Sequence, residues 1–192
     1  MKRCILVALT LWSSVVMAAA QADNLPVQVD AKRDGDKVLI SASFTADVPK
    51  ELVWQVMIDF DHMAEFMPRL AQSRVVQREG DRLTVNQHGS VHVGFFDIPF
   101  DSTREIQLKP PGELDSRAIG GNNGPMQSVA TLTQQGRQTV ISYHAEWQPT
   151  SGFMASLGVD LIKSQLGEQF GAMRQEMLRR AARNSSQTAA IP

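Results

Sequence analysis

The stretch SGFMASLGVDLIKSQLGEQFGAMRQEMLRRAAR, residues 151–183, decides the fold that we expect for this chain. Apolar residues recur in it at steps of three and four, which places them along one stripe of an α-helix. They are Phe153, Leu157, Leu161, Ile162, Leu166, Phe170, Met173 and Met177. Such a helix would be about 45 Å long at about 1.5 Å per residue. A long amphipathic helix that closes a series of strands predicts a lid over a sheet.

Three glycines, Gly158, Gly167 and Gly171, flank the apolar stripe, although each costs about 1 kcal/mol relative to alanine in a helix interior. Gly167 and Gly171 lie beside Leu166 and Phe170 and lower that side of the helix. There the helix either approaches the sheet closely or leaves room for a bound molecule. The sequence leaves both alternatives open.

Upstream of this helix, the pattern predicts one strand, two short helices and six further strands. Residues 38–44 alternate with period two, as in a strand. Asp47 and Pro49 then suit the start of a helix, with Asp47 as its cap, and a second short helix at 61–67 is stopped by Pro68. From residue 70 to residue 147, turn residues separate six alternating runs, which we expect to pair as antiparallel neighbours. These turn residues occupy 79–81, 94, 110–112, 120–125 and 135–136.

The predicted fold class is therefore α+β. A curved seven-stranded antiparallel sheet packs on the long C-terminal helix, and two short helices follow the first strand. We expect one domain over residues 37–183, after a lead-in at 23–36 and before a disordered tail at 184–192.

The N-terminal residues 1–22 have the pattern of a cleaved secretory signal peptide. Lys2 and Arg3 precede an apolar run from Ile5 to Met17, and an A-x-A pattern ends at Ala22. The alternative, a transmembrane anchor, would need about 20 apolar residues, and this run is shorter. The sequence thus predicts a soluble protein that is secreted or periplasmic. Its mature form would contain no thiol, because Cys4 is the only cysteine.

Composition excludes several classes of function. Removal of Lys2 and Arg3 leaves 17 basic against 20 acidic residues, a net charge of −3, and no basic run suggests nucleic-acid binding. No zinc pattern, phosphate-binding glycine loop or nucleophile–base pair is recognisable, so we predict no metal, no cofactor and no catalytic residue. We also expect no stable membrane insertion, while transient membrane contact and protein partners stay open.

Several ordered motifs resemble one known superfamily. They are Ala46-Asp47-Val48-Pro49 with Val53-Trp54, Asp59-Phe60, Pro68, the corner Gly121-Asn122, the strand with Tyr143, and Pro149 before the terminal helix. In order and spacing the chain resembles the START-like (SRPBCC) helix-grip proteins over residues 37–180, specifically the polyketide cyclase/dehydrase and lipid-transport group that includes coenzyme Q-binding domains. The resemblance implies a cavity between sheet and helix that holds an apolar ligand. Members include lipid carriers, quinone-binding proteins and aromatase/cyclases, so it does not select one function.

The turn at Gly94 predicts how polar residues meet inside the sheet. If Gly94-Phe95 is a two-residue type II′ turn, Val93 faces Phe96, and the ladder then pairs Gln87 with Ser102 and Val85 with Arg104. Gln87, Ser102 and Arg104 would thus lie on the side that faces the long helix. A buried guanidinium needs a partner, so Arg104 is either the polar anchor of an apolar pocket or a rim residue whose stem extends outward.

Two histidine–aspartate pairs follow from the same register, His92 with Asp97 and His88 with Asp101, on the polar face. The two histidines would be about 13 Å apart at about 3.3 Å per residue, too far to share one metal ion. We interpret them as charge pairs on the solvent face.

The function favoured by these observations is an exported binding or carrier protein for an apolar small molecule, such as a lipid, quinone or polyketide-like compound. The sheet would contribute Phe96, Phe100, Tyr143 and Trp147 to the cavity, and the helix Phe153, Leu157, Leu161, Leu166 and Phe170. Polar contacts would come from Gln87, Ser102, Arg104 and Tyr143. The alternative is a cyclase or dehydratase in the same cavity, with Arg104 or Tyr143 acting on a carbonyl. A third possibility is a pocket filled by its own side chains, in a domain that serves as an interaction surface.

Overall fold

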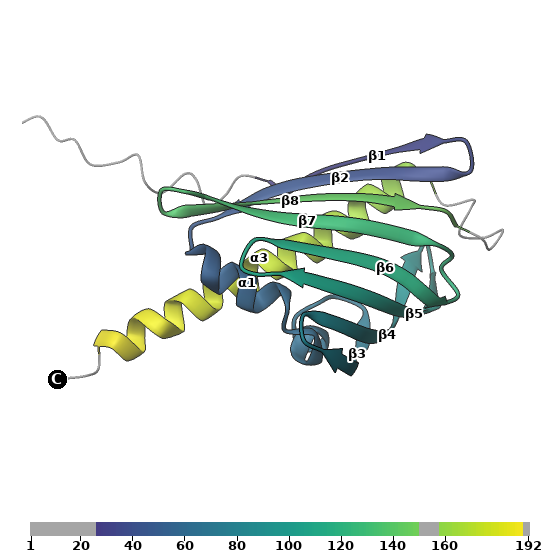
Figure 1. Ribbon diagram of the computed structural model, residues 1–192. Helices are drawn as coiled ribbons and strands as arrows, with labels where there is room; N and C mark the ends of the chain where they lie inside the picture. The colour runs from purple at the N-terminus through teal and green to yellow at the C-terminus, as the bar shows by residue number, and fades with distance from the viewer. Residues whose placement is uncertain (1–25, 150–157, 190–192) are drawn as a thin grey trace, which may run out of the picture.

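The computed structural model describes residues 26–149 and 158–189, which form one antiparallel sheet, two short helices and one long helix (Figure 1). Eight strands in this part of the chain follow the order β1-β2-β8-β7-β6-β5-β4-β3. The elements along the chain are β1 Gln28–Asp34, β2 Lys37–Ala46, α1 Lys50–Met57, the 3-10 helix η2 Phe60–Glu65, β3 Leu70–Glu79, β4 Arg82–Val93, β5 Phe96–Lys109, β6 Glu113–Gly121, β7 Met126–Gln135, β8 Gln138–Trp147 and α3 Val159–Ala189.

The predicted α+β helix-grip architecture is confirmed, with one strand more than the expected seven. The additional strand, β1, lies where the sequence predicts a lead-in, and it pairs with β2 along its whole length. Its side chains are mostly charged and exposed, and Ala31 alone among them is buried, so backbone pairing rather than an apolar pattern forms this edge strand. At the other end, α3 continues to Ala189, past residue 184 where the sequence predicts a disordered tail.

One face of the sheet is apolar and the other is polar, as the period-two patterns predict. In β2, for example, Val38, Ile40, Ala42 and Phe44 are all buried and alternate with half-exposed residues. The turn at Gly94 has the predicted two residues, Gly94 has φ +62°, and Val93 pairs with Phe96. Register along β4 and β5 therefore matches the prediction, including Gln87 with Ser102 and Val85 with Arg104.

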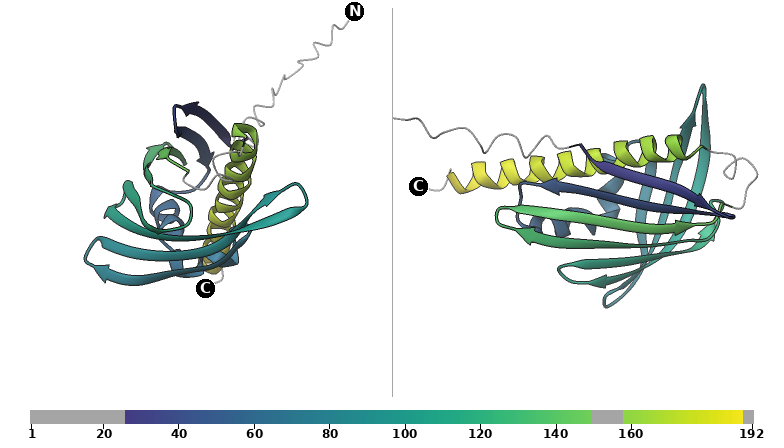
Figure 2. Two further views of the ribbon diagram at one scale, coloured as in Figure 1. Left: turned by 90° about the vertical axis from the view of Figure 1, so that its right-hand side faces the viewer. Right: turned by 90° about the horizontal axis from the view of Figure 1, so that it is seen from above.

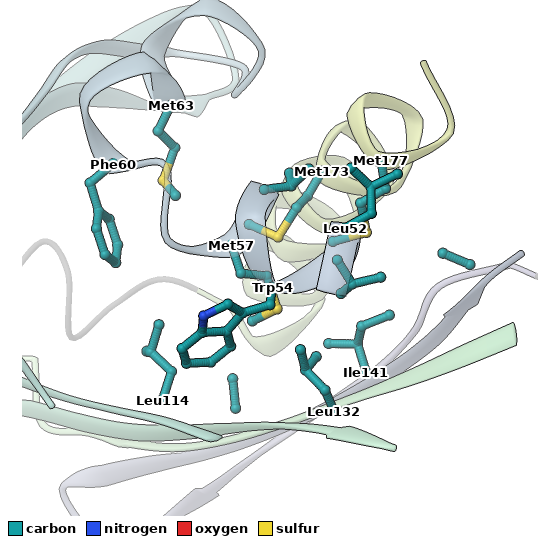
Figure 3. Close-up of a cluster of buried hydrophobic side chains, with 14 of the residues drawn as sticks. Leu52, Trp54, Met57, Phe60, Met63, Leu114, Leu132, Ile141, Met173 and Met177 are labelled. Carbon is teal, nitrogen blue, oxygen red and sulfur yellow. The ribbon is translucent and has the colours of Figure 1, made fainter. Parts of the chain in front are cut away.

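The long helix α3 lies along the concave side of the curved sheet (Figure 2). Its C-terminal half packs against α1, where Met173 and Met177 meet Leu52 in one hydrophobic core that also includes Leu132 and Ile141 of the sheet (Figure 3). Its N-terminal half contributes Ile162 to a second, smaller core with Val38, Ile40 and Trp147. No helix within the described ranges has an apolar stretch long enough to cross a membrane.

The first helix is capped differently from the prediction. Asp47 makes no capping hydrogen bond; its carboxylate pairs with Arg137 at 3.2 Å. Instead, the Lys50 backbone N–H donates to the Gln134 side-chain oxygen at 2.8 Å. A glutamine on β7 thus satisfies one of the free N–H groups at the start of α1, a contact between segments 84 residues apart.

A charged cluster joins the start of η2 to the C-terminal half of α3. Arg180 lies between two carboxylates, with Nη2 at 2.7 Å from Asp59 Oδ2 and Nε at 2.6 Å from Glu176 Oε1, and Arg179 also pairs with Glu176. Hydrogen bonds from Arg179 and Arg180 lower the pKa of the buried Glu176 despite its desolvation. Burial raises the pKa of Asp59, but hydrogen bonds from His62 and Arg180 outweigh it, and the net pKa is lowered.

The lowered pKa of both carboxyls makes the stability of this cluster acid-sensitive. Their contribution is present above the ordinary values of 3.8 and 4.5 and is lost as the pH falls through the folded-state values. We expect Glu176→Gln to cost about 1–3 kcal/mol near pH 6 and to make the loss of stability below pH 4.5 shallower. Urea unfolding measured from pH 3 to 6 checks this, and Glu51→Gln on the exposed side of α1 is the control. Parallel pH curves for Glu176→Gln and the wild type would contradict it.

Candidate functional site

Two cavities lie between the sheet and α3. The inner cavity, about 150 Å³, extends toward α1 and η2 and is lined by Met57, Phe60, Met63, Ile106, Leu114, Phe170 and Met173, among others. The outer cavity, about 230 Å³, lies under the first turns of α3 and is lined by residues that include Val91, Phe100, Trp147, Leu161, Ile162 and Leu166. Most of these side chains are apolar, so both cavities suit an apolar guest.

Three polar residues, Gln87, Arg104 and Tyr143, line both cavities, and we call them the polar belt. They come from three strands, β4, β5 and β8, and share the face of the sheet that α3 covers. The belt thus marks the place where the inner and outer cavities meet. Other polar side chains line only the outer cavity, as Ser102, Asn123, Gln165 and Gln169 do, or only the inner one, as Ser116 and Ser128 do.

Arg104 is half-buried and points inward, so the alternative of a rim residue with an outward stem is wrong. Its guanidinium donates to two buried hydroxyls, Ser116 Oγ at 2.7 Å and Ser128 Oγ at 3.4 Å, and contacts Met126 Sδ at 3.7 Å. No carboxylate lies within 4.0 Å of it among residues 26–149 and 158–189. Within this part of the chain, the cation at the centre of the site therefore has only neutral partners.

A β-bulge accompanies this side chain. Thr103 pairs with Gly120 but Arg104 pairs with Ala118, so β6 contains one extra residue, Ile119, opposite the step between them. Ser116 and Ser128 pair directly across β6 and β7, which presents their two hydroxyls side by side. The ladder thus places both acceptors within reach of one guanidinium.

The other two belt residues are held by neighbouring side chains. The Gln87 amide donates to Ser73 Oγ at 3.2 Å and to Met63 Sδ at 3.5 Å. The Tyr143 ring lies 5.2 Å from the Phe170 ring in a tilted arrangement, and Phe170 in turn lies 5.7 Å from Phe44. Ser73 of β3 and Met63 of η2 thus position the Gln87 amide, and Phe170 of α3 positions the Tyr143 ring.

Most of the sequence-predicted site residues that the structure describes lie at the two cavities. Gln87, Arg104 and Tyr143 line both of them, Phe170 lines the inner one, and the outer one includes Phe100, Ser102, Trp147, Leu161 and Leu166. Phe96 is an exception, since it is 73% exposed at the end of the β4–β5 hairpin and lines neither cavity. Phe153 and Leu157 lie outside the described residues.

Sequence reasoning missed several residues of the site. Ser116 of β6, the next strand along the chain, and Ser128 and Met126 of β7 hold Arg104. The inward parity of Ser116 within β6 is a usable signal, because a buried serine between apolar neighbours needs a partner. Met57, Met63 and Met173 are buried members of the hydrophobic core and also line the inner cavity, so these side chains fill the core and border the cavity at the same time.

The glycines of α3 do not serve a close approach to the sheet. A Cβ built on Gly167 or Gly171 meets no atom within 4 Å. By contrast, a Cβ on Gly89 of β4 would lie 2.4 Å from the Arg69 carbonyl oxygen and 2.9 Å from the Phe100 ring. Gly89 and Phe100 are cross-strand partners, so the bare backbone at Gly89 lets that aromatic ring lie over it beside the outer cavity.

Alanine at these two kinds of glycine should have opposite effects. Gly89→Ala forces the backbone near Arg69 or the Phe100 ring to move, and we expect a loss of about 1–3 kcal/mol in the free energy of unfolding. Gly171→Ala meets open space in a helix and should gain up to about 1 kcal/mol. Denaturant unfolding of both variants measures these changes. A stable Gly89→Ala variant would show that the close approach is not required.

A further hollow of about 700 Å³ lies on the opposite face of the sheet. Its walls include outward-facing charged residues such as Glu105 and Arg117, which pair with each other at 2.9 Å. Farther along that face, His92 and His88 pair with Asp97 and Asp101 as the register predicts. Within the described ranges, no three histidine, cysteine or acidic side chains gather closely enough to hold a metal ion. We therefore take the two interior cavities as the site.

Comparison with protein families gives one match, which covers more than half of the chain. The polyketide cyclase / dehydrase and lipid transport family matches residues 46–174, from the end of β2 into α3. A search of curated proteins gives no match.

Solved structures with a similar fold include proteins named for lipid transfer and proteins named as aromatase/cyclases. A STAR-related lipid transfer protein from Xanthomonas axonopodis has a TM-score of 0.69 at 11% identity, over 84% of this chain and 96% of that one. A protein from Thermus thermophilus has a TM-score of 0.65 at 14% identity, over 74% and 98%. The Zhui aromatase/cyclase from Streptomyces sp. R1128 has a TM-score of 0.59 at 18% identity, over 76% and 96%. At these identities the likeness establishes the fold alone.

Proposed function

We propose that this chain, which belongs to the polyketide cyclase / dehydrase and lipid transport family, is an exported binding or carrier protein for an amphiphilic small molecule. The apolar body of a lipid, quinone or polyketide-like compound would occupy the interior cavities. A hydrogen-bond-accepting group of that molecule, optimally a carboxylate, would contact Arg104. The observation that carries this proposal is the half-buried guanidinium of Arg104, which lies at the junction of two largely apolar cavities and whose partners among the described residues are all neutral.

The energetics of an inward cation favour such a ligand. A charge removed from water is costly unless it is paired, and two serine hydroxyls with one thioether compensate it only in part. An acceptor on the ligand would supply the missing partner, and a carboxylate would do so through two parallel hydrogen bonds. The apolar walls would contribute about 25 cal/mol for each Å² that the ligand buries, before the costs of association.

The size of the site is compatible with a small or slender guest. Each cavity is smaller than the roughly 300–1,000 Å³ of typical ligand pockets, while the two together reach the lower end of that range. The flexible side chains of Met57, Met63 and Met173 line the inner cavity and can adjust to different apolar shapes. A linear chain that passes the polar belt would use both cavities.

Arg104 provides the direct test of this function. We expect a twelve-carbon fatty acid to bind the wild type more tightly than the alcohol of the same length, because only the acid forms a charge-assisted pair. Arg104→Met should weaken the acid about 10- to 100-fold and the alcohol much less. Isothermal titration calorimetry or displacement of an apolar dye measures both affinities.

The matched control is Arg117→Met. Arg117 lies on the adjacent strand but on the outer face, where it pairs with Glu105. Its loss should leave both affinities unchanged. If the wild type binds neither dye nor acid, and extracts of the protein purified from its host contain no apolar compound by mass spectrometry, the carrier proposal fails. The interior would then belong to a domain with a filled core that serves as an interaction surface.

A second candidate, a cyclase or dehydratase, is favoured by the same polar belt. Arg104 and Tyr143 both face the cavities, where a guanidinium or phenol can polarise a carbonyl or transfer a proton. Turnover of a poly-β-keto or hydroxyacyl substrate that is lost in both Arg104→Met and Tyr143→Phe would establish the enzyme. Ligand binding without turnover supports the carrier.

Export forms a separate part of the proposal and rests on the sequence of residues 1–22. When the full-length gene is expressed in a host with a secretory pathway, we expect the accumulated protein to begin at Asp23. Intact-mass spectrometry of the periplasmic or secreted fraction determines this N-terminus. Replacement of Ala20 and Ala22 by bulky residues should block processing, and an unprocessed wild-type chain in the cytosol would contradict export.

A further inference from the structure

Two adjacent phenylalanines, Phe95 and Phe96, lie exposed at the tip of the β4–β5 hairpin. Phe95 is 99% exposed and Phe96 is 73% exposed, the two highest values among the large apolar side chains that the structure describes. A Cβ built on the neighbouring Gly94 would meet no atom within 4 Å, so this position of the turn borders open space. Figure 2 shows this teal hairpin reaching past the first turns of α3. Exposed apolar groups of this kind mark an interaction site.

The hairpin connects its tip to the outer cavity along one face. Cross-strand pairs on the inward side are Val93 with Phe96, Val91 with Ile98, and Gly89 with Phe100. Val91 and Phe100 line the outer cavity, and the α3 side chain Gln165 donates to the His92 carbonyl at 3.3 Å, which holds the hairpin against the helix. An uninterrupted apolar strip therefore leads from the exposed tip to the cavity, while the outer side of the hairpin is polar.

The dimensions of the tip indicate what covers it. Two phenylalanine side chains offer about 300–500 Å², whereas a stable protein interface buries about 800 Å² on each partner. A narrow, convex projection also lacks the surrounding surface that a second protein or a second copy would need. A lipid bilayer has no such requirement, because its interface accepts isolated aromatic side chains at the depth of the headgroups.

The charges beside the tip favour a neutral membrane surface. His92 pairs with Asp97 at 2.9 Å and His88 pairs with Asp101, and no lysine or arginine occurs from residue 88 to residue 103. The hairpin therefore offers no excess of positive charge to anionic lipids. Its contact with a membrane would depend on apolar insertion and only weakly on salt.

From these observations we propose that the β4–β5 hairpin docks the protein on a bilayer by inserting Phe95 and Phe96 into the interface of zwitterionic lipids. The contact is reversible, since even a whole myristoyl chain gives only marginal membrane binding. Docked in this way, the inward strip of the hairpin connects the lipid phase with the outer cavity. Docking itself rests on the exposed tip, and only the exchange of a ligand along the strip rests on the proposed function.

The test is co-sedimentation of the protein with phosphatidylcholine vesicles. We expect the wild type to bind and the double variant Phe95→Ser/Phe96→Ser to bind at least tenfold more weakly. Val76→Ser is the matched control, because Val76 is a 54% exposed apolar residue on β3, away from the tip. All variants carry the same N-terminus, so any contribution of residues 1–25 cancels. Binding should change little between about 0.1 M and about 1 M NaCl, over which the Debye length falls from about 10 Å to about 3 Å.

Depth of insertion provides a second measurement. Phe95→Trp should retain vesicle binding and show more quenching by brominated acyl chains than the wild type, whereas Val76→Trp should show no more than the wild type. Native Trp54 and Trp147 are both buried at 8% exposure, and the third native tryptophan, Trp12, is common to all variants. Equal vesicle binding by the wild type and the double serine variant would overturn the proposal, as would loss of binding at high salt. A change of mass in light scattering for the serine variant without vesicles would show instead that the tip joins copies of the chain. Unchanged dye binding by the serine variant would show that the loss of vesicle binding does not come from damage to the interior cavities.

Discussion

The burial of one apolar sheet face beneath α3 is the constraint on which the rest of the structure depends. Each strand directs alternate side chains toward that face, and water must be excluded from them. The C-terminal half of α3 meets this demand together with α1, because Met173 and Met177 fill the space between helix and sheet (Figure 3). Farther toward its N-terminus, α3 has no second helix beside it among the described residues, and it presents Gln165 and Gln169 as well as apolar residues. The outer cavity lies under this part of α3, and the inner cavity extends from the polar belt toward α1 and η2.

The polar belt is the place where polar side chains interrupt the apolar face of the sheet inside this core. Register places Gln87 and Arg104 on the covered face, where an apolar residue would be the simpler choice. The neighbouring strands respond with Ser73, Ser116 and Ser128, whose buried hydroxyls accept the hydrogen bonds of these side chains. Neutral acceptors orient a guanidinium without neutralising it. The arrangement therefore keeps a positive charge available in the interior, which is what binding an acceptor group requires.

Local sequence signals predicted the strands and the β4–β5 ladder. The ladder was predictable because a two-residue turn at Gly94 determines which residue of β4 pairs with which residue of β5. The same parity placed Phe96 on the helix side correctly, yet Phe96 is not in the cavity. The alternation of apolar and polar residues predicts which face of the sheet a side chain occupies. It does not predict how far α3 extends over that face, and the β4–β5 hairpin extends past α3 (Figure 2). Edge strand β1 was missed because backbone pairing with β2, rather than an apolar pattern, holds it. Gln134 as the cap of α1 joins segments far apart in the chain, which no local signal can indicate.

By itself, the sequence determined the order of elements, the apolar parity of the strands, the register of β4 against β5 and the identity of most interior residues. All of these follow from contacts between residues close in the chain or from a period of two or 3.6. Only the tertiary structure decided that Arg104 points inward with neutral partners, that Gly167 and Gly171 border open space, and that Phe95 and Phe96 project from the molecule. These outcomes depend on where β6, β7 and α3 lie relative to β5, and on how far the helix extends over the sheet. Burial and hydrogen bonding between distant segments set those positions, and neither quantity has a period in the sequence.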